Sequence, residues 1–377
     1  MFERLAGQEA VVEQLRTAAG SSRLAHAWLF TGPPGSGRSV AARAFAAVLL
    51  CSQQGCGQCA ACRQVAAGTH PDLLLIQPEG LSYGVRQTRD LVLRAAGSPV
   101  LGGWRVVLFE DADRATEQAA NALLKAIEEP PRRTIWLLCA PSAADLPVTI
   151  RSRCALVTLR TPPTAAVAAI LEREGVGHVE AVAAARASLG HIGRARLLAT
   201  DQEAARRRAD VMTVPMRSTG LGGAFAAAAG LVKAAEAEAA ATTAALDGPE
   251  REALMRALGE GSTGRGVASA IRGSAGAVKD LEERQKSRAT RIKRDALDLA
   301  LLDLAAFYRD VLAVQFGADV ELANTAAAAE LQAIADSSGP ATTIRRIEAI
   351  MRCRQRLAAS VAPLLAVEEL TLSLAGY

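Results

Sequence analysis

The fold is decided by the stretch Ala27-Trp28-Leu29-Phe30-Thr31-Gly32-Pro33-Pro34-Gly35-Ser36-Gly37-Arg38-Ser39. An apolar run of strand length ends there in a glycine-rich loop, and residues 39–50 continue as an alanine-rich helical stretch. Strand, loop and helix in this order form a phosphate-binding unit, because backbone N–H groups and the amino end of the helix face the anion. The stretch therefore predicts a phosphate-loop-like unit near the start of an α/β domain.

Three further apolar runs of strand length follow, at residues 73–76, 105–109 and 134–139. Helical stretches such as residues 115–127 separate them. Continuous apolar runs that alternate with helices indicate a parallel sheet covered on both faces. The next segment, residues 149–154, is expected to end a strand-and-loop unit.

From Thr164 onward we expect helices and no strand. Apolar side chains recur at helical spacing between residues 288 and 314. They are Ile292, Leu297, Leu301, Leu304, Tyr308 and Val311. Glycine-rich joints at residues 220–223 and 259–266 are expected to interrupt the helices.

The chain has 377 residues, which exceeds the usual size of one domain. We expect three domains. Residues 1–160 would be an α/β domain with an inserted cysteine module at 51–62, residues 161–209 a small helical domain, and residues 210–377 an all-helical domain.

The composition indicates the class of protein but does not identify its binding partner. Aromatic residues make up only 3%, so the cores must be built from aliphatic side chains and alanine, which favours helix packed on helix. The net charge of +4 allows contact with nucleic acid without arguing for it. No secretory leader and no apolar run of about 18 residues is apparent, so we expect a cytoplasmic protein that does not enter a membrane.

Four of the seven cysteines crowd into one short module, Cys51-x4-Cys56-x2-Cys59-x2-Cys62. Four thiolates at this spacing can close around a tetrahedral Zn²⁺, which would leave no position for water and make the site structural. The alternative is a set of four buried, unliganded thiols. The other three cysteines, Cys139, Cys154 and Cys353, are expected to be small buried apolar residues.

The glycine loop carries Arg38 where a working phosphate loop needs lysine. The planar guanidinium is bulkier than an ammonium, so this exchange is not conservative in a loop shaped around lysine. We expect Gly32, Gly35, Gly37 and Ser39 to retain the shape of a nucleotide site whose chemistry Arg38 weakens. ATP or ADP as a ligand stays open at this point.

The strand at residues 105–109 leads into Glu110 and Asp111, where an ATPase places Asp to hold Mg²⁺ and then Glu to orient water. Here the two acids stand in reversed order. Each oxygen would be displaced by about one C–C bond, and a displacement of about 1 Å can cost ~10²-fold in rate. The alternative is that both acids are ordinary solvated loop residues.

Several motifs together carry a family resemblance. They occur in the order found in bacterial clamp-loader subunits, and they are residues 26–33, the four-cysteine module, residues 68–72, residues 121–131 and Ser152-Arg153-Cys154. The chain resembles the delta-prime family of subunits of the bacterial DNA polymerase III clamp loader, which are AAA+ proteins. The specific motifs cover about residues 1–200, and the remainder resembles the family mainly in its helical character.

The resemblance implies an AAA+ module, with residues 161–209 as its lid, followed by a helical collar that joins five subunits in a ring. The partners would be gamma/tau and delta subunits, and the assembly would use ATP to open a sliding clamp and place it on primed DNA. Arg153 would be an arginine finger that reaches the ATP of an adjacent gamma/tau subunit. The alternative is that Arg153 pairs with a local acid.

The resemblance also bears on the chain's own site. Cys139-Ala140-Pro141 offers no hydroxyl where catalytic relatives carry a threonine sensor, whereas Arg194 occupies a second sensor motif and could reach a phosphate. These residues therefore leave nucleotide binding undecided, and we do not expect this chain to hydrolyse ATP efficiently. No polymerase activity of its own is expected.

Two other functions are alternatives. A gamma/tau-type motor ATPase would carry the lysine, the ordinary acid order and the sensor hydroxyl, all of which are missing. A zinc-stabilised DNA-binding adaptor would use basic runs such as residues 206–208 and 286–294, but no aromatic residues interleave them as a base-stacking surface requires.

Overall fold

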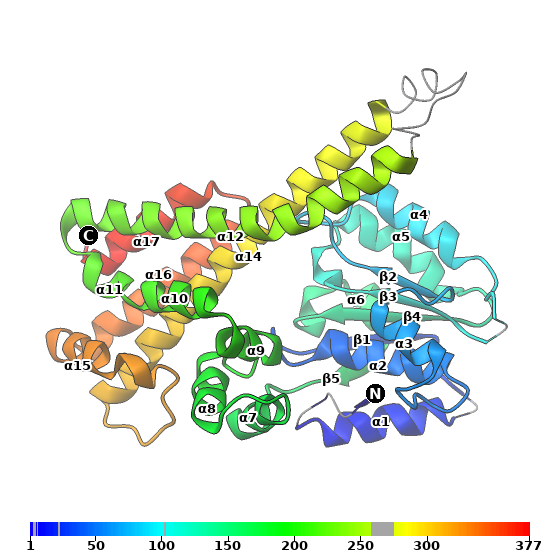
Figure 1. Ribbon diagram of the computed structural model, residues 1–377, viewed down its shortest axis with the longest axis horizontal. Coiled ribbons are helices and arrows are strands. Elements are labelled where there is room, and N and C mark those ends of the chain that lie inside the picture. The colour runs from blue at the N-terminus through cyan, green and yellow to red at the C-terminus, as the bar shows by residue number, and fades with distance from the viewer. Residues whose placement is uncertain (3–4, 6, 22, 102, 258–274) are drawn as a thin grey trace. The chain divides into compact units, whose positions relative to one another are not determined.

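The structure is a computed structural model, and it describes residues 1–2, 5, 7–21, 23–101, 103–257 and 275–377 (Figure 1). The expected joint at residues 259–266 lies outside the described residues. These residues separate into two compact units, residues 1–78 with 82–200, and residues 79–81 with 201–377. The division into three domains stays a prediction.

The first unit is built on a five-stranded parallel sheet in the order β2-β3-β4-β1-β5. Its strands are β1 (Ala27–Thr31), β2 (Leu73–Ile76), β3 (Arg105–Phe109), β4 (Thr134–Ala140) and β5 (Ala155–Thr158). The first four strands confirm the sequence prediction, as does the parallel arrangement.

Strand β5 was not among the strands that the sequence predicted, the last of which covered residues 134–139. The segment before it is also not a strand, because residues 148–151 form the short helix α6 (Val148–Arg151). Only Val157 of the four β5 residues is fully buried, since β5 is an edge strand paired with β1 alone. Its apolar run within the strand, Ala155-Leu156-Val157, is shorter than the runs of four residues or more that revealed the other four strands.

Alternate residues of each central strand point to opposite faces of the sheet and enter different cores. Trp28 and Phe30 of β1 pack with α1 (Glu9–Ala19), α2 (Arg38–Leu50) and α3 (Ala60–Ala67). Leu29, between them, packs on the other face with α4 and α5. The elements on that face are α4 (Val85–Ala95), the turn Ala112–Arg114, α5 (Glu117–Glu128) and the turn Ala143–Asp145. Both faces are therefore covered, as Figure 1 shows.

Three short helices complete the first unit around a small core of their own. They are α7 (Thr164–Arg173), α8 (His178–Ala187) and α9 (Ile192–Thr200). Gly175 and Gly190 separate them with φ angles of +94° and +85°, which glycine adopts without strain. We refer to α7–α9 as the lid helices.

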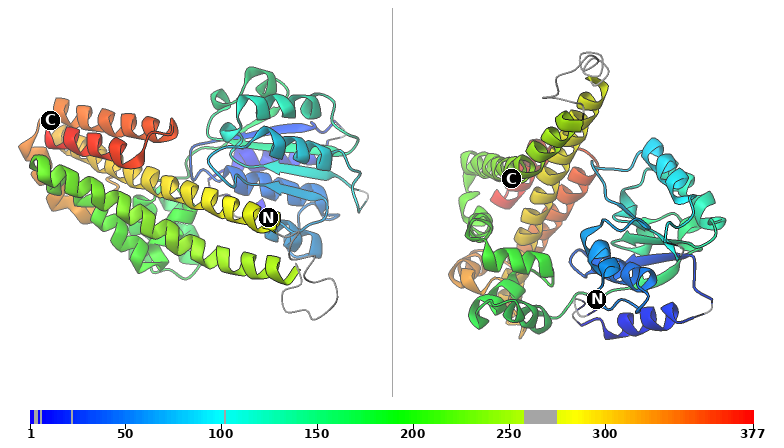
Figure 2. Two further views of the ribbon diagram at one scale, coloured as in Figure 1. Left: turned by 90° about the horizontal axis from the view of Figure 1, so that it is seen from above. Right: turned by 45° about the vertical axis from the view of Figure 1, so that its right-hand side comes forward.

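The second unit contains helices and no strand among its described residues. Its helices are α10 (Gln202–Met212), α11 (Val214–Arg217), α12 (Gly220–Ala257), α14 (Ala275–Gln315), α15 (Ala328–Ser337), α16 (Pro340–Ala358) and α17 (Pro363–Ala375), with a 3₁₀ turn at Thr325–Ala327. Figure 2 shows α12 and α14 as two long neighbouring helices. The joint expected at residues 220–223 lies slightly earlier, because α11 ends at Arg217 and α12 begins at Gly220, whose φ is +65°.

The predicted apolar periodicity of residues 288–314 is confirmed in α14. Its side chains Leu297, Leu301, Leu304, Tyr308 and Val311 are buried in the core of the second unit, and Ile292 is half-buried. Within the described part of the chain, no helix is both long enough and apolar enough to cross a membrane.

A buried ion pair joins α10 to α14 inside this second unit. Arg208 Nε donates to Asp303 Oδ1 at 3.2 Å, and the Asp303 side chain is only 4% exposed. Arg208 also donates to Asn324 Oδ1, so the guanidinium ties two neighbouring segments to α10.

We expect Asp303→Ala to lower the free energy of unfolding of the second unit by about 3–5 kcal/mol, because it removes a buried carboxylate that accepts a charge-assisted hydrogen bond from Arg208. Calorimetric unfolding of the full chain measures the shift. Glu203→Ala is the matched control, because Glu203 pairs with Arg206 at a surface where both side chains are more than 60% exposed. A control effect as large as that of Asp303→Ala would contradict the argument.

Candidate functional site

The glycine loop lies between the carboxyl end of β1 and the amino end of α2, where sequence analysis expected it. Gly35 and Gly37 have φ angles of +85° and +88°. A β-carbon on Gly35 would lie 2.4 Å from Cβ of His191, so only glycine allows the loop to pack against the turn that precedes α9. Helix α2 begins at Arg38 without a side-chain cap, which leaves its first N–H groups available to an anion.

Arg38 does not extend freely into the space in front of the loop. Its Nη1 donates to the Gly32 carbonyl at 3.0 Å, and its Nη2 donates to Asp111 Oδ1 at 3.1 Å. The side chain is only 14% exposed. The arginine that replaces the lysine is therefore held between its own loop and the acidic end of β3.

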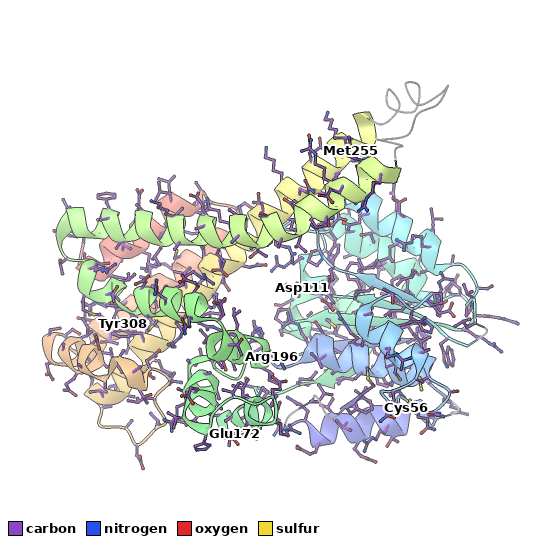
Figure 3. All side chains as sticks on the ribbon, viewed as in Figure 1. Cys56, Asp111, Glu172, Arg196, Met255 and Tyr308 are labelled. Carbon is purple, nitrogen blue, oxygen red and sulfur yellow. The ribbon has the colours of Figure 1, made fainter. Side chains whose placement is uncertain are left out.

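The other acid at the end of β3 is paired as well. Arg43 of α2 donates to Glu110 Oε1 at 3.0 Å, and the Gln77 amide donates to Glu110 Oε2 at 3.0 Å. Figure 3 labels Asp111 at this end of the sheet. The two carboxylates expected at a magnesium site are thus each matched by a guanidinium from α2, so neither is an ordinary solvated loop residue.

The end of β4, where a threonine sensor would supply a hydroxyl, is buried. Cys139 and Ala140 are fully buried, and the Pro141 carbonyl accepts the N–H of Gly32 at 3.1 Å. Burial raises the pKa of Cys139, so its thiol stays neutral. The end of β4 therefore supports the loop through its backbone and offers no charged or hydroxyl group to a ligand.

A pocket of about 780 Å³ opens between the glycine loop and the lid helices. This volume is in the range of small-molecule and cofactor sites. Its walls combine the loop, apolar side chains and three arginines. The lining residues are Leu5, Pro34, Gly35, Ser36, Gly37, Arg38, Ser39, Val40, Ile170, Arg173, Glu174, His191, Ile192, Gly193 and Arg196.

The lid supplies two arginines that sequence analysis did not name. Arg173, at the end of α7, and Arg196, on α9, both line the pocket, whereas the buried Arg194 does not. Arg196 donates to both oxygens of Glu174, at 2.7 and 2.5 Å. Figure 3 labels Arg196 on α9. No local motif marks Arg173 or Arg196, because their positions depend on how the lid folds over the loop.

His191 and His70 are packing and turn residues rather than parts of a metal-binding group. His191 lines the pocket, and burial lowers its pKa, as does the positive charge of Arg194. Its Nδ1 accepts the backbone N–H of Arg194 at 3.2 Å. His70 is buried, and its Nδ1 accepts the backbone N–H of Asp72 at 3.1 Å. Both are packing and turn residues, and His191 also forms part of the pocket wall.

Arg153 follows α6 and precedes β5, at the surface of the first unit. Its Nη2 lies 2.7 Å from Glu128 Oε1, and its Nη1 donates to the Thr149 carbonyl at 2.8 Å. Both charged side chains are about 40% exposed. Arg153 does not line the pocket, so within the described residues it makes a local ion pair and is not brought to the chain's own phosphate loop.

The four cysteines of the module are brought together. Their sulfur atoms all lie within 4.8 Å of one another, and Cys51 Sγ is 3.9 Å from Cys56 Sγ and 3.6 Å from Cys59 Sγ. A tetrahedral Zn²⁺ with bonds of about 2.3 Å separates its sulfurs by about 3.8 Å. The four sulfurs therefore have the spacing that a structural zinc ion needs.

The backbone of the module is also shaped for metal-bound sulfur. The N–H of Gly57 donates to Cys62 Sγ at 3.3 Å, and Gly55 and Gly57 both have φ of +81°. Burial raises the pKa of Cys62 to about 12. At Cys51 burial also raises the pKa, but hydrogen bonds with the backbone of the same turn outweigh it and bring the pKa to about 6. Hydrogen bonds from the backbone of this turn therefore favour the thiolate form of Cys51.

The remaining cysteines differ in burial. Cys139 and Cys353 are buried, as expected for small apolar residues, whereas Cys154 is only half-buried. Burial nevertheless raises the pKa of Cys154 to about 11. None of the three belongs to the group of four sulfur atoms at residues 51–62.

Comparison with known proteins relates the first unit to DNA polymerase III. A family model described as "DNA polymerase III, delta subunit" matches residues 7–163. The DNA polymerase III subunit delta' of Pseudomonas aeruginosa is 42% identical over 165 residues, which are 42% of this chain and 49% of that protein. The chain spans about half the length of the delta-prime relatives it matches.

Two further comparisons concern gamma subunits of DNA polymerase III. The DNA polymerase III subunit gamma/tau of Mycobacterium tuberculosis is 35% identical over 184 residues, covering 46% of this chain and 32% of that protein. The crystal structure of a gamma subunit-related protein of DNA polymerase III from Thermotoga maritima aligns over 97% of this chain and 98% of that chain, with 19% identity and a TM-score of 0.41. Residues 7–163, which hold the phosphate loop, the cysteine module and the Ser152-Arg153-Cys154 motif, are therefore similar to the family of DNA polymerase III delta subunits, and delta-prime proteins are among the relatives that this part of the chain matches.

Proposed function

We propose that the chain acts as a delta-prime subunit of the DNA polymerase III clamp loader. In this role it has a degenerate ATP site and supplies Arg153 to the ATP site of a neighbouring gamma/tau subunit. The observation that carries the proposal is the contrast between two arginines. Arg38 is enclosed and paired with the acids of its own site, whereas Arg153 is half-exposed at the surface of the same unit.

The pairing of both acids argues against hydrolysis at the chain's own site. In an ATPase these carboxylates hold Mg²⁺ and position the attacking water. Here Asp111 accepts from Arg38 and Glu110 accepts from Arg43, so both carboxylates are already engaged. The reversed order of the acids and the missing sensor hydroxyl also argue against ATP hydrolysis at this site.

The ion pair of Arg153 does not prevent it from serving a neighbour. An exposed pair contributes only about 0–1 kcal/mol, so Arg153 can exchange Glu128 for a phosphate at small cost. A guanidinium that reaches the γ-phosphate across an interface neutralises the charge that develops there. The local pair would keep Arg153 oriented until a partner arrives.

The other parts of the chain have roles consistent with this proposal. The helical second unit would join gamma/tau and delta subunits in a five-membered ring. Zn²⁺ held by Cys51, Cys56, Cys59 and Cys62 would stabilise the first unit. The assembly would load a sliding clamp onto primer–template DNA in the cytoplasm, and this chain would contact DNA only as part of the ring.

One alternative is a gamma/tau-type motor ATPase, because gamma/tau proteins are also among the relatives. The two functions differ in the ATPase activity that they predict for the isolated chain.

We expect the purified chain to hydrolyse no ATP above background in the presence of Mg²⁺, measured as phosphate release. Turnover that Arg38→Ala abolishes would favour the motor and contradict the proposal.

The DNA-binding adaptor is less well supported by the basic residues of the second unit. Arg288 forms ion pairs with Asp247 and Glu250, and Lys293 forms one with Glu236. These cations already form ion pairs with acids of α12, which reduces the positive charge that is available to bind DNA phosphates.

We expect Arg153→Ala to reduce ATP turnover at the served gamma/tau site by ~10³–10⁵-fold, because the finger's charge is lost from the transition state. The measurement is clamp- and DNA-stimulated ATP turnover, together with clamp loading, by the reconstituted loader. Arg153→Lys should restore little, since lysine lacks the planar fork.

Arg151→Ala is the matched control, because Arg151 is an exposed arginine two positions earlier in the same segment. It should leave turnover and loading unchanged. Unchanged turnover in Arg153→Ala, with the ring assembled, would refute the arginine-finger role.

We expect one zinc ion per chain in freshly purified protein, measured by elemental analysis. Cys59→Ser should lower the zinc content and the melting temperature of the first unit, since a structural zinc site contributes directly to folding stability. Cys154→Ser, outside the cluster, should change neither. Protein that carries no zinc and melts at the same temperature after chelation would contradict the metal site.

A further inference from the structure

Arg153 is held against its own unit by three acceptors. Its Nη2 lies 2.7 Å from Glu128 Oε1, and its Nη1 donates to the Thr149 carbonyl at 2.8 Å and to Ser152 Oγ at 3.3 Å. Thr149 lies four residues earlier in the chain, so the side chain of Arg153 is folded back along α6. Both terminal nitrogens of the guanidinium are therefore engaged before any partner binds.

The two elements that carry this ion pair are fixed relative to one another, because they share one core. Glu128 is the last residue of α5, and Ile127 before it is fully buried. On α6, Ile150 is buried in the same core. The backbone N–H of Arg153 donates to the Ile150 carbonyl at 3.1 Å. Separation of Arg153 from Glu128 therefore needs a rotation of side chains and no movement of the backbone.

The carboxyl end of α5 attracts a cation. The last carbonyl groups of a helix carry a partial negative charge, which favours cations there and disfavours acids. Glu128 nevertheless stands at this end, and Glu129 follows it, with both side chains exposed. Arg153 supplies the cation that such a helix end favours. The guanidinium therefore stays at this position until another anion competes for it.

Arg151 indicates that this restraint is particular to Arg153. It is an exposed arginine two positions earlier in the same segment, and among the described residues it forms no ion pair. An exposed side chain without partners keeps its rotamer freedom. The restraint is thus found at the arginine to which the finger role is assigned and not at its neighbour.

We propose that Glu128 regulates the arginine finger by competing with the neighbouring subunit's γ-phosphate for Arg153. This proposal rests on the function proposed above, in which Arg153 serves a gamma/tau subunit. While Arg153 is paired with Glu128, the finger is retracted against α6. A triphosphate in the adjacent site presents a more highly charged anion, to which the planar guanidinium can donate two parallel hydrogen bonds. Arg153 then exchanges the carboxylate for the phosphate.

The competition makes insertion of the finger depend on the nucleotide of the partner. ADP lacks the γ-phosphate, so Arg153 stays with Glu128 when the neighbouring site holds ADP. Because the ion pair is exposed, it opposes insertion by no more than about fivefold. Glu128 therefore shifts the equilibrium of the finger without blocking it.

The test is clamp- and DNA-stimulated ATP turnover by the reconstituted loader that carries Glu128→Gln. This substitution keeps the length of the side chain and removes its charge. We expect turnover to rise about two- to fivefold, because an exposed ion pair that opposes insertion is lost. The gain should become smaller as the salt concentration rises, since salt screens the pair in the unmodified chain.

Glu129→Gln is the matched control, because it removes the same charge from the next exposed residue and leaves the ion pair in place. It should not change turnover. Glu128→Gln combined with Arg153→Ala should turn over ATP no faster than Arg153→Ala alone, because Glu128 acts only through Arg153. Melting curves show whether each variant is folded.

Unchanged or reduced turnover with Glu128→Gln would overturn the proposal, and a reduction would mean that Glu128 orients the finger instead of restraining it. In either case, a large loss of turnover with Arg153→Ala would still support the finger role. Unchanged turnover with Arg153→Ala would instead remove the proposed function, and the role of Glu128 with it.

Discussion

The parallel pairing of β1 with β4 on one side and β5 on the other is the constraint on which the first unit depends. Because the strands run in one direction, their carboxyl ends meet at one edge of the sheet. The glycine loop after β1, the acids after β3 and Pro141 after β4 are therefore neighbours. The N–H of Gly32 donates to the Pro141 carbonyl, which fixes the start of the loop to this edge.

Ion pairs change the chemistry of this edge of the sheet, although the glycine loop keeps the shape of a phosphate loop. Each carboxylate that would hold Mg²⁺ or water is neutralised by an arginine of α2, at 3.1 Å for Asp111 and 3.0 Å for Glu110. Such partly buried pairs are screened less than surface pairs and are costly to break. The surface pair of Arg153 with Glu128 is weak by comparison, so the two arginines have different freedom to act.

The cysteine module and the sheet were predictable for different reasons. Cys51, Cys56, Cys59 and Cys62 lie within twelve residues, so local turns with glycines at positive φ bring them together without help from the rest of the fold. Strands β1 to β4 each show as a continuous apolar run of four residues or more. Strand β5 escaped prediction because its apolar run, Ala155-Leu156-Val157, is shorter and only Val157 in it is fully buried.

By itself, the sequence determined the elements whose cause is local: four apolar strands, the glycine loop, the four-thiolate cluster and the helical periodicity of α14. It also revealed that the loop lacks lysine and that the acids are reversed. Only the tertiary structure decided what those changes mean, because the pairs of Arg38 with Asp111 and of Arg43 with Glu110 join residues far apart in the chain. The same holds for Arg173 and Arg196, which enter the pocket because the lid helices pack over the loop, a contact that no short-range pattern encodes.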